Sequence, residues 1–225
     1  GVPIDSNFMT EHSIQQFDYY KTLIINEPVE QVAPVQLPLL EFKPLTQRKT
    51  IACGDSHNVA VGFRAAQNST SAIQFTALGS DTLTAQTTAN YNTAIGRAAL
   101  GVLTTGGNNT SVGALALDAC TTGDSNTCVG YNAGTAVTTG TNNTYIGLSA
   151  GQANTESSGN TAIGYQALQT HDSTSGEGYH YNTAIGGKAM HDADTTYSGT
   201  AVGYQAMENA VDGYNNIAIG YNVTL

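Results

Sequence analysis

The chain has no tryptophan, and its seven lysines and arginines stand against 17 aspartates and glutamates, so the formal net charge is −10. A nucleic-acid-binding surface needs concentrated positive charge, and this composition therefore argues against nucleic acid as a partner. The sequence also lacks an apolar run of about 18 residues, and it lacks a charged segment leading into an apolar stretch. Neither membrane insertion nor secretion is predicted.

Proline is missing from most of the chain, because all five prolines fall within the first 44 residues. Residues 28–44 are interrupted by proline too often to form a continuous helix or a central strand. We predict an N-terminal extended docking arm at 1–50 and a separate repeat domain at 51–225. A linker, or a cover for the first repeat, is the alternative role for the arm.

A short repeat fills the second of these domains. The pentad Asn-Thr-Ala-Ile-Gly at 92–96 returns in close variants, and its glycine marks the register. The marking glycines are Gly62, Gly79, Gly96, Gly113, Gly130, Gly147, Gly164, Gly186, Gly203 and Gly220. Their spacing is 17 residues except from Gly164 to Gly186, where it is 22. A fixed period of this length is typical of a solenoid, in which each repeat forms one coil.

The residue before each marking glycine is apolar and mostly β-branched. This column consists of Val61, Leu78, Ile95, Val112, Val129, Ile146, Ile163, Ile185, Val202 and Ile219. Such a column, in a short run bounded by Asn and Gly, predicts the inward face of a β-strand. Three and four residues after the glycine come a small residue and a larger one, such as Ala99 and Leu100, which predict a second inward segment.

Together these columns predict an all-β parallel roll of about ten coils, each with two strands of about four to six residues and two turns. Turn chemistry is supplied by Gly, Asn and Thr between the coils, for example at 104–109. One narrow coil buries too few aliphatic side chains to offset the ordering of its residues. We therefore expect stabilisation by stacking and by association with other copies.

The segment Asn-Thr-Ala-Ile-Gly-Tyr-Gln-Ala-Leu at 160–168 resembles the head repeats of trimeric autotransporter adhesins. It is still more similar to related repeats in phage and algal-virus fibre proteins. This resemblance covers residues 58–224 and implies a homotrimer of left-handed parallel β-rolls. The period of 17 is longer than the usual repeat of the bacterial heads, which implies longer corners on one edge.

The extra residues between Gly164 and Gly186 are the most distinctive interruption of the repeat. Five residues there are candidates for a receptor-contact loop, with Tyr179 as an aromatic platform: His171, Asp172, Glu177, Tyr179 and His180. A tolerated surface loop is the simpler interpretation, and a metal site from these side chains is a further alternative.

The three cysteines show no metal-ligand spacing. Cys128 shares its column with Ala94, and Cys120 shares its column with Leu103, so both are predicted to be small core residues. Free thiols of this kind fit assembly in a reducing cytoplasm. With no recurring carboxylate pair and no Ser-His-Asp arrangement, we expect no catalytic residues, no metal and no cofactor.

These observations predict a non-enzymatic structural protein of a virion fibre or spike. Its expected partners are copies of itself, other virion proteins reached through the arm, and a host receptor or glycan. The first alternative is the head of a bacterial trimeric autotransporter adhesin on a cell surface. The second is an ice-binding solenoid, suggested by paired threonines that recur in register, such as Thr104-Thr105, although corner hydrogen bonding explains these pairs more simply.

Overall fold

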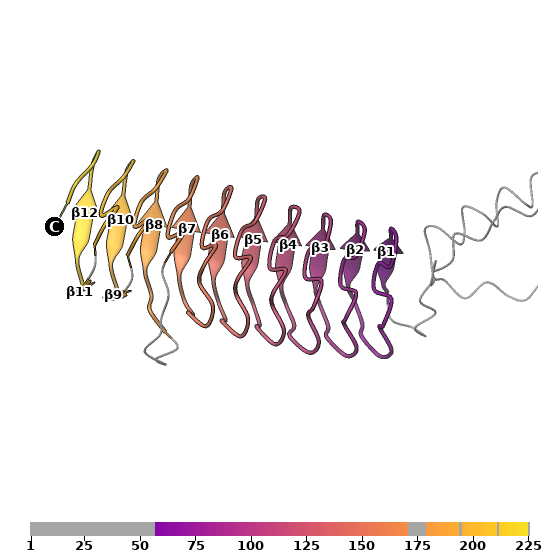
Figure 1. The fold of residues 1–225 in the computed structure, drawn as a ribbon. Helices are drawn as coiled ribbons and strands as arrows, with labels where there is room; N and C mark the ends of the chain where they lie inside the picture. Colours follow the sequence, from indigo (N-terminus) through magenta and orange to yellow (C-terminus); the bar gives the residue numbers. More distant parts are fainter. Residues whose placement is uncertain (1–56, 171–178, 194, 211, 225) are drawn as a thin grey trace, which may run out of the picture.

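The structure, a computed structural model, describes residues 57–170, 179–193, 195–210 and 212–224. These residues form a parallel β-solenoid in which each coil adds one strand to a single long sheet (Figure 1). The ten strands of this sheet follow chain order: β1 (Val59–Val61), β2 (Thr76–Leu78), β3 (Thr93–Ile95), β4 (Thr110–Val112), β5 (Thr127–Val129), β6 (Thr144–Ile146), β7 (Thr161–Ile163), β8 (Thr183–Ile185), β10 (Thr200–Val202) and β12 (Ile217–Ile219). The predicted all-β solenoid is confirmed, whereas the predicted arm at 1–50 lies outside the described residues.

The strands pair without a register slip. Thr93 pairs with Thr110 and, across the longer interval, Thr161 pairs with Thr183. The five extra residues therefore do not change the register of the strands on either side of them. At about 4.8 Å between strands, the nine intervals give a rod roughly 43 Å long.

Each coil contains less strand than predicted. A second strand occurs only in the last part of the rod, where β9 (Thr195–Tyr197) pairs with β11 (Asp212–Tyr214). Elsewhere in the described residues the return path consists of turns, and no helix is present. The reason is visible in Ala98 and Leu100, whose φ angles of 57° and 51° are left-handed and interrupt an extended chain. No helix in the described part of the chain could span a membrane.

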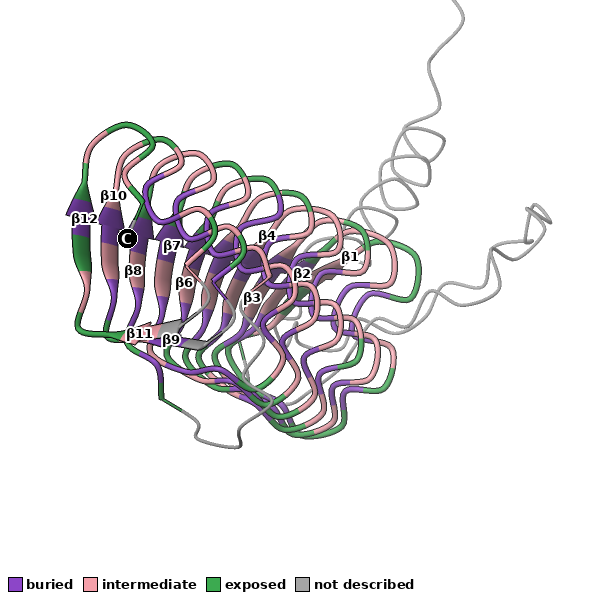
Figure 2. Ribbon diagram, turned by 60° about the vertical axis from the view of Figure 1, so that its left-hand side comes forward, coloured by how far each residue is buried: buried purple, intermediate pink, exposed green. Residues whose placement is uncertain are grey.

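The core is built from the middle residue of each strand, and the predicted inward face is therefore wrong. Ala94 is fully buried, whereas Thr93 and Ile95 on either side of it face outward and are only partly covered. The same alternation holds along the sheet, and Figure 2 shows the buried residues running along the inside of the coils. Because successive side chains of a strand point to opposite faces, only one of the two apolar columns can point inward. Because the coil is narrow, the small residue, such as Ala94, points inward and the larger one, such as Ile95, points outward.

The second inward segment was predicted correctly. Ala99 and Leu100 are both fully buried, as are the equivalent residues of most other coils. They close the core against the strand column, together with a third buried column that holds Leu103, Cys120, Val137 and Ala193, so each coil buries only a few small or medium-sized apolar side chains. Such a small core per coil makes contacts between coils the main source of stability.

Asparagine side chains join the coils inside the rod. Asn109 donates its backbone N–H to Oδ1 of Asn92 at 2.9 Å and its side-chain Nδ2 to the carbonyl of Gly123 at 2.8 Å. Asn126 repeats this arrangement one coil later. These amides are buried, and hydrogen bonding in both directions offsets the cost of burying them.

The marking glycines are required by two independent constraints. At Gly130 φ is +139°, a conformation that side chains rarely adopt, and a Cβ would overlap the carbonyl oxygen of Gly147 in the next coil. The same close approach recurs from coil to coil, so a methyl group would push adjacent coils apart.

One coil contains a large residue in the small column. Tyr145 stands where most other coils have alanine, and it is fully buried. Space for its ring comes from Gly134 and Gly151, which replace the buried leucine of their own coils. A Cβ at Gly151 would lie 2.6 Å from the Tyr145 ring, and one at Gly134 would lie 3.0 Å from it. The oversized and undersized residues compensate each other.

We predict that Gly130→Ala destabilises the protein by about 3 kcal/mol or more, because the methyl group meets both the unfavourable φ and the next coil. Chemical unfolding followed by circular dichroism measures the loss. Gly187→Ala is the matched control, since Gly187 does not have a positive φ and the atoms closest to its Cβ would belong to the Tyr204 side chain, with no backbone atom nearer than 4.0 Å. Equal losses in the two variants would contradict the argument.

We also predict strong coupling between Tyr145 and Gly151. Tyr145→Ala leaves a cavity and is expected to cost about 3–5 kcal/mol, and Gly151→Leu overpacks the core at a cost of about 1–3 kcal/mol. The double variant recreates the alanine and leucine of neighbouring coils, where Leu100 and Leu168 adopt the same left-handed φ as Gly151. Its cost should fall below the sum of the single costs by at least about 1 kcal/mol, whereas additive costs would show that the ring and the glycine are independent.

Candidate functional site: the outward sheet face and the corners

The outward face of the ten-stranded sheet carries two parallel rows of side chains. The first row is threonine in eight strands: Thr76, Thr93, Thr110, Thr127, Thr144, Thr161, Thr183 and Thr200. The second row is the apolar column that precedes the marking glycines. We call these two rows together the sheet face. Strand pairing places each member directly beside its equivalent in the next coil.

The apolar row of the sheet face is exposed to an unusual degree for branched residues. Ile163 keeps 37% of its surface exposed and Leu78 keeps 45%, while the shorter valines are partly covered by their neighbours. An apolar stripe that follows a rod over its whole described length is much larger than scattered surface leucines or valines. Contiguous patches of this kind mark interaction surfaces.

The paired threonines, such as Thr104-Thr105, lie at a corner of the coil outside the sheet face, and they have a structural role. The hydroxyl of Thr104 donates to the carbonyl of Thr121 at 2.9 Å, and Thr138 donates to Thr155 at 3.1 Å. Corner hydrogen bonding is thus confirmed as the explanation for the first threonine of each pair. Because these hydroxyls already bond the next coil, the first threonines of the pairs offer less to an external ligand than those of the sheet face.

The predicted receptor-contact residues divide into three groups. His171, Asp172 and Glu177 lie outside the described residues. Tyr179 is exposed and its ring stacks on Tyr181, with 5.5 Å between the centroids. His180 is buried and stacks on Tyr197 at 4.6 Å, so its side chain belongs to the interior of the coil.

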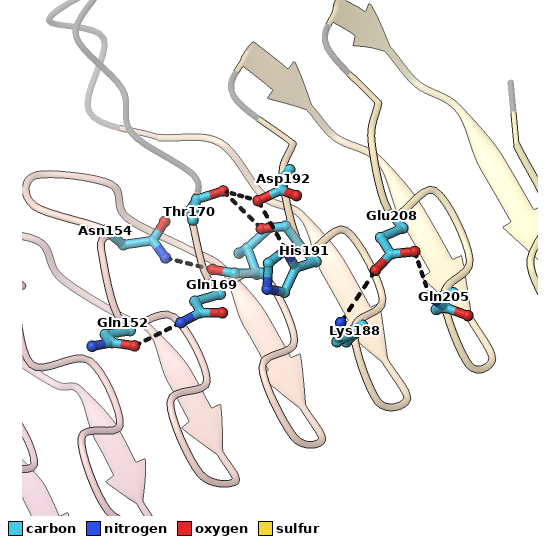
Figure 3. Close-up of polar contacts among 10 residues, drawn as sticks. Gln152, Asn154, Gln169, Thr170, Lys188, His191, Asp192, Gln205 and Glu208 are labelled. Carbon is cyan, nitrogen blue, oxygen red and sulfur yellow. Dashed lines mark hydrogen bonds and ion pairs between the residues drawn. The ribbon is translucent and has the colours of Figure 1, made fainter.

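A band of polar contacts crosses the turns of the coils around 152–208 (Figure 3). Gln169 donates to the side-chain oxygen of Gln152 at 2.7 Å. Further along, Asp192 accepts a hydrogen bond from Thr170 at 2.9 Å and pairs with His191 at 2.8 Å. Partial burial opposes ionisation of Asp192, but the bonds from His191 and Thr170 outweigh it and lower the pKa of this carboxyl group.

The band continues beyond Asp192 with one ion pair. Glu208 accepts a hydrogen bond from Gln205 at 2.6 Å and pairs with Lys188 at 3.6 Å. In the described part of the chain, no cluster of three or more His, Cys, Asp or Glu side chains has an arrangement that could hold a metal ion. The band is therefore a set of fixed donors and acceptors on the surface.

Cys120 and Cys128 are buried and free, as predicted for small core residues, while Cys53 lies outside the described residues. Burial raises the pKa of the Cys120 thiol to about 11, and the nearby negative charge of Asp124 contributes in the same direction. Burial also raises the pKa of Cys128. Neither thiol has the exposure or the lowered pKa of a reactive cysteine.

The sequence contained a signal for the sheet face that hydrophobicity alone did not reveal. Threonine and isoleucine in each pentad lie two residues apart, with a small residue between them, and this is the spacing of one strand face. The residue between them is alanine in most coils, and this small residue indicates the crowded side. The stacking of tyrosines, by contrast, could not be predicted from a local sequence pattern, because the stacked rings come together only after the chain has folded.

We predict that a Cys53→Ser variant reacts with a thiol reagent at least about 100-fold more slowly when folded than when unfolded, because burial suppresses the thiolate of both remaining cysteines. The rate is measured at pH 8 with and without denaturant. A fast reaction in the folded state would place at least one of these thiols at the surface.

Comparisons with protein-family models, with curated proteins and with solved structures find no match to this chain. The support for a function therefore comes from the fold, the sheet face and the corners described above.

Proposed function

We propose that this protein is a non-enzymatic structural segment of a virion fibre or spike that assembles side by side with copies of itself through the sheet face. The observation that carries the proposal is the unbroken apolar row on the outside of a straight rod. In water, exposed branched side chains along the whole rod favour association by about 25 cal/mol per Å² of apolar area removed from contact with water.

The shape of the sheet face favours parallel rods in a closed assembly. The face is long and narrow, and it lies on one side of the coil (Figures 1 and 2). Rods related by a rotation axis along their length bring equivalent faces together and leave none exposed, which limits uncontrolled growth. We take the number of rods in the assembly, three, from the resemblance of the repeats to those of fibre and adhesin heads. In this proposal the arm at 1–50 docks the assembly onto other virion proteins, and the corners face the host surface.

Association of three identical rods also suits attachment. Each rod repeats the same corners, and weak contacts from several copies add through their high effective concentration. The acidic composition, with a net charge of −10, keeps assemblies of this kind from clumping with one another. The head of a bacterial trimeric autotransporter adhesin would use the same architecture and is the first alternative.

The sheet face also supports ice binding as a second candidate. Its rows of threonine hydroxyls and branched methyl groups repeat at the strand spacing on one flat sheet, which suits an ordered array of water molecules. The paired threonines at the corner carry this idea less well, because the hydroxyl of the first threonine in each pair bonds the neighbouring coil. Ice binding requires the sheet face to be open to solvent, and self-association requires it to be covered, so the two proposals exclude each other.

We predict a mass in solution near three times 23.3 kDa, measured by light scattering on a sizing column. Ile146→Glu should convert the assembly to folded monomers, because three carboxylates would be buried near the axis without partners. Val102→Glu is the control, since Val102 is exposed to a similar extent but lies outside the sheet face. A folded wild-type monomer would refute the assembly, and thermal hysteresis in that monomer would support ice binding.

A further inference from the structure

The residue directly after each marking glycine lies at the corner beside the sheet face. These residues, which we call the corner row, are Phe63, Ser80, Arg97, Ala114, Tyr131, Leu148, Tyr165, Gly187, Tyr204 and Tyr221. From Tyr131 onward every member is a large exposed side chain except Gly187. From Tyr131 onward the row therefore contains one gap, and the gap lies between two tyrosines.

The gap is one corner residue long. The coils that carry Tyr165 and Tyr204 are two strand spacings, or about 9.6 Å, apart, and both side chains are about half exposed. Stacked rings normally have centroids about 4.5–7 Å apart, so a ring placed midway contacts both tyrosines. Tyr204 and Tyr221, on successive coils, show the ring orientation of the row: they stack at 5.7 Å with an interplanar angle of 18°.

Glycine is not needed at this position by the backbone. Gly187 does not have a positive φ, and the closest atom to a Cβ added there would be Cδ2 of the Tyr204 side chain at 3.3 Å. The preceding interval of the row is a natural comparison, because Leu148 fills the same place between Tyr131 and Tyr165. The missing side chain at Gly187 is what distinguishes this interval.

The coils of Gly187 and Tyr204 also supply polar side chains that hold one another. Lys188 follows Gly187 directly in the chain, and its ammonium group pairs with Glu208 (Figure 3). The Glu208 carboxylate is also held by Gln205, which belongs to the same corner as Tyr204. A carboxylate, an amide and an ammonium group next to two aromatic faces form the usual set of contacts for a polar ring: apolar faces for stacking and a few placed donors and acceptors.

We propose that the gap over Gly187, between Tyr165 and Tyr204, is a subsite for a neutral pyranose ring of a surface glycan. The C–H face of such a sugar stacks on the tyrosines, and its hydroxyls bond Lys188 and Glu208. A neutral sugar is favoured over an anionic one because Glu208 and the net charge of −10 repel acids. The proposal rests on the attachment function proposed above, for which it names the chemical class of the partner.

The test uses the full chain on an immobilised panel of glycans that end in glucose, galactose, mannose, N-acetylglucosamine or sialic acid. We expect binding to at least one neutral glycan and none that depends on sialic acid. Tyr204→Ala and Gly187→Leu should each reduce this binding at least tenfold. Gly187→Leu copies the filled interval at Leu148, so it closes the gap without removing a ring, and Tyr131→Ala is the control that leaves the gap intact.

Two outcomes would overturn the subsite: no neutral glycan binds, or Gly187→Leu binds as well as the wild type. The mass of each variant is measured by light scattering in parallel, which separates this proposal from the assembly. A trimer that binds no neutral glycan refutes the subsite alone. If the wild type is a monomer that binds neutral glycans, and the Gly187→Leu variant does not bind them, the assembly alone is refuted.

Discussion

The close approach of backbones in neighbouring coils is the constraint on which the rest of the molecule depends. Each strand bonds the next without a register slip, and at the marking glycines one coil lies against the carbonyl of the following one, as Gly130 does with Gly147. This contact fixes the coil spacing, and the spacing in turn aligns the asparagine ladder and every surface row. A single misplaced side chain in the glycine column would disturb both the interior and the surface.

A narrow coil distributes its apolar residues in an unusual way. The strand column inside the coil takes mostly alanine, so the larger branched side chains of the strands are left on the outside of the sheet. Burying them requires another molecule, and this links the weakness of the single rod to its proposed assembly. Where the interior does contain a large ring, at Tyr145, two glycines make the room, which shows how little volume is free.

The repeat itself was the most informative part of the sequence. Its period predicted the solenoid, and Ala99 and Leu100 were placed in the core correctly because a small residue and a larger one recur there in most coils. Ile95 was misplaced because its hydrophobicity suggests a core residue, while the space inside depends on the coil's width, which no single repeat reveals. The strand length was overestimated for a related reason: Ala98 and Leu100 adopt left-handed conformations that their residue types do not favour. His180 was expected in a surface loop, but its burial depends on stacking against Tyr197 in the next coil.

The interval between Gly164 and Gly186 shows that the number of residues in a coil can change without a change in the register between its strands. Five additional residues lie between these two glycines, yet Thr161 and Thr183 pair as the equivalent residues of any other two strands do. Foreign peptides inserted in this interval would therefore leave the pairing of the flanking strands unaltered. Whole coils could equally be duplicated or deleted in units of 17 residues, so a lineage of such proteins can change its reach and its displayed loops independently.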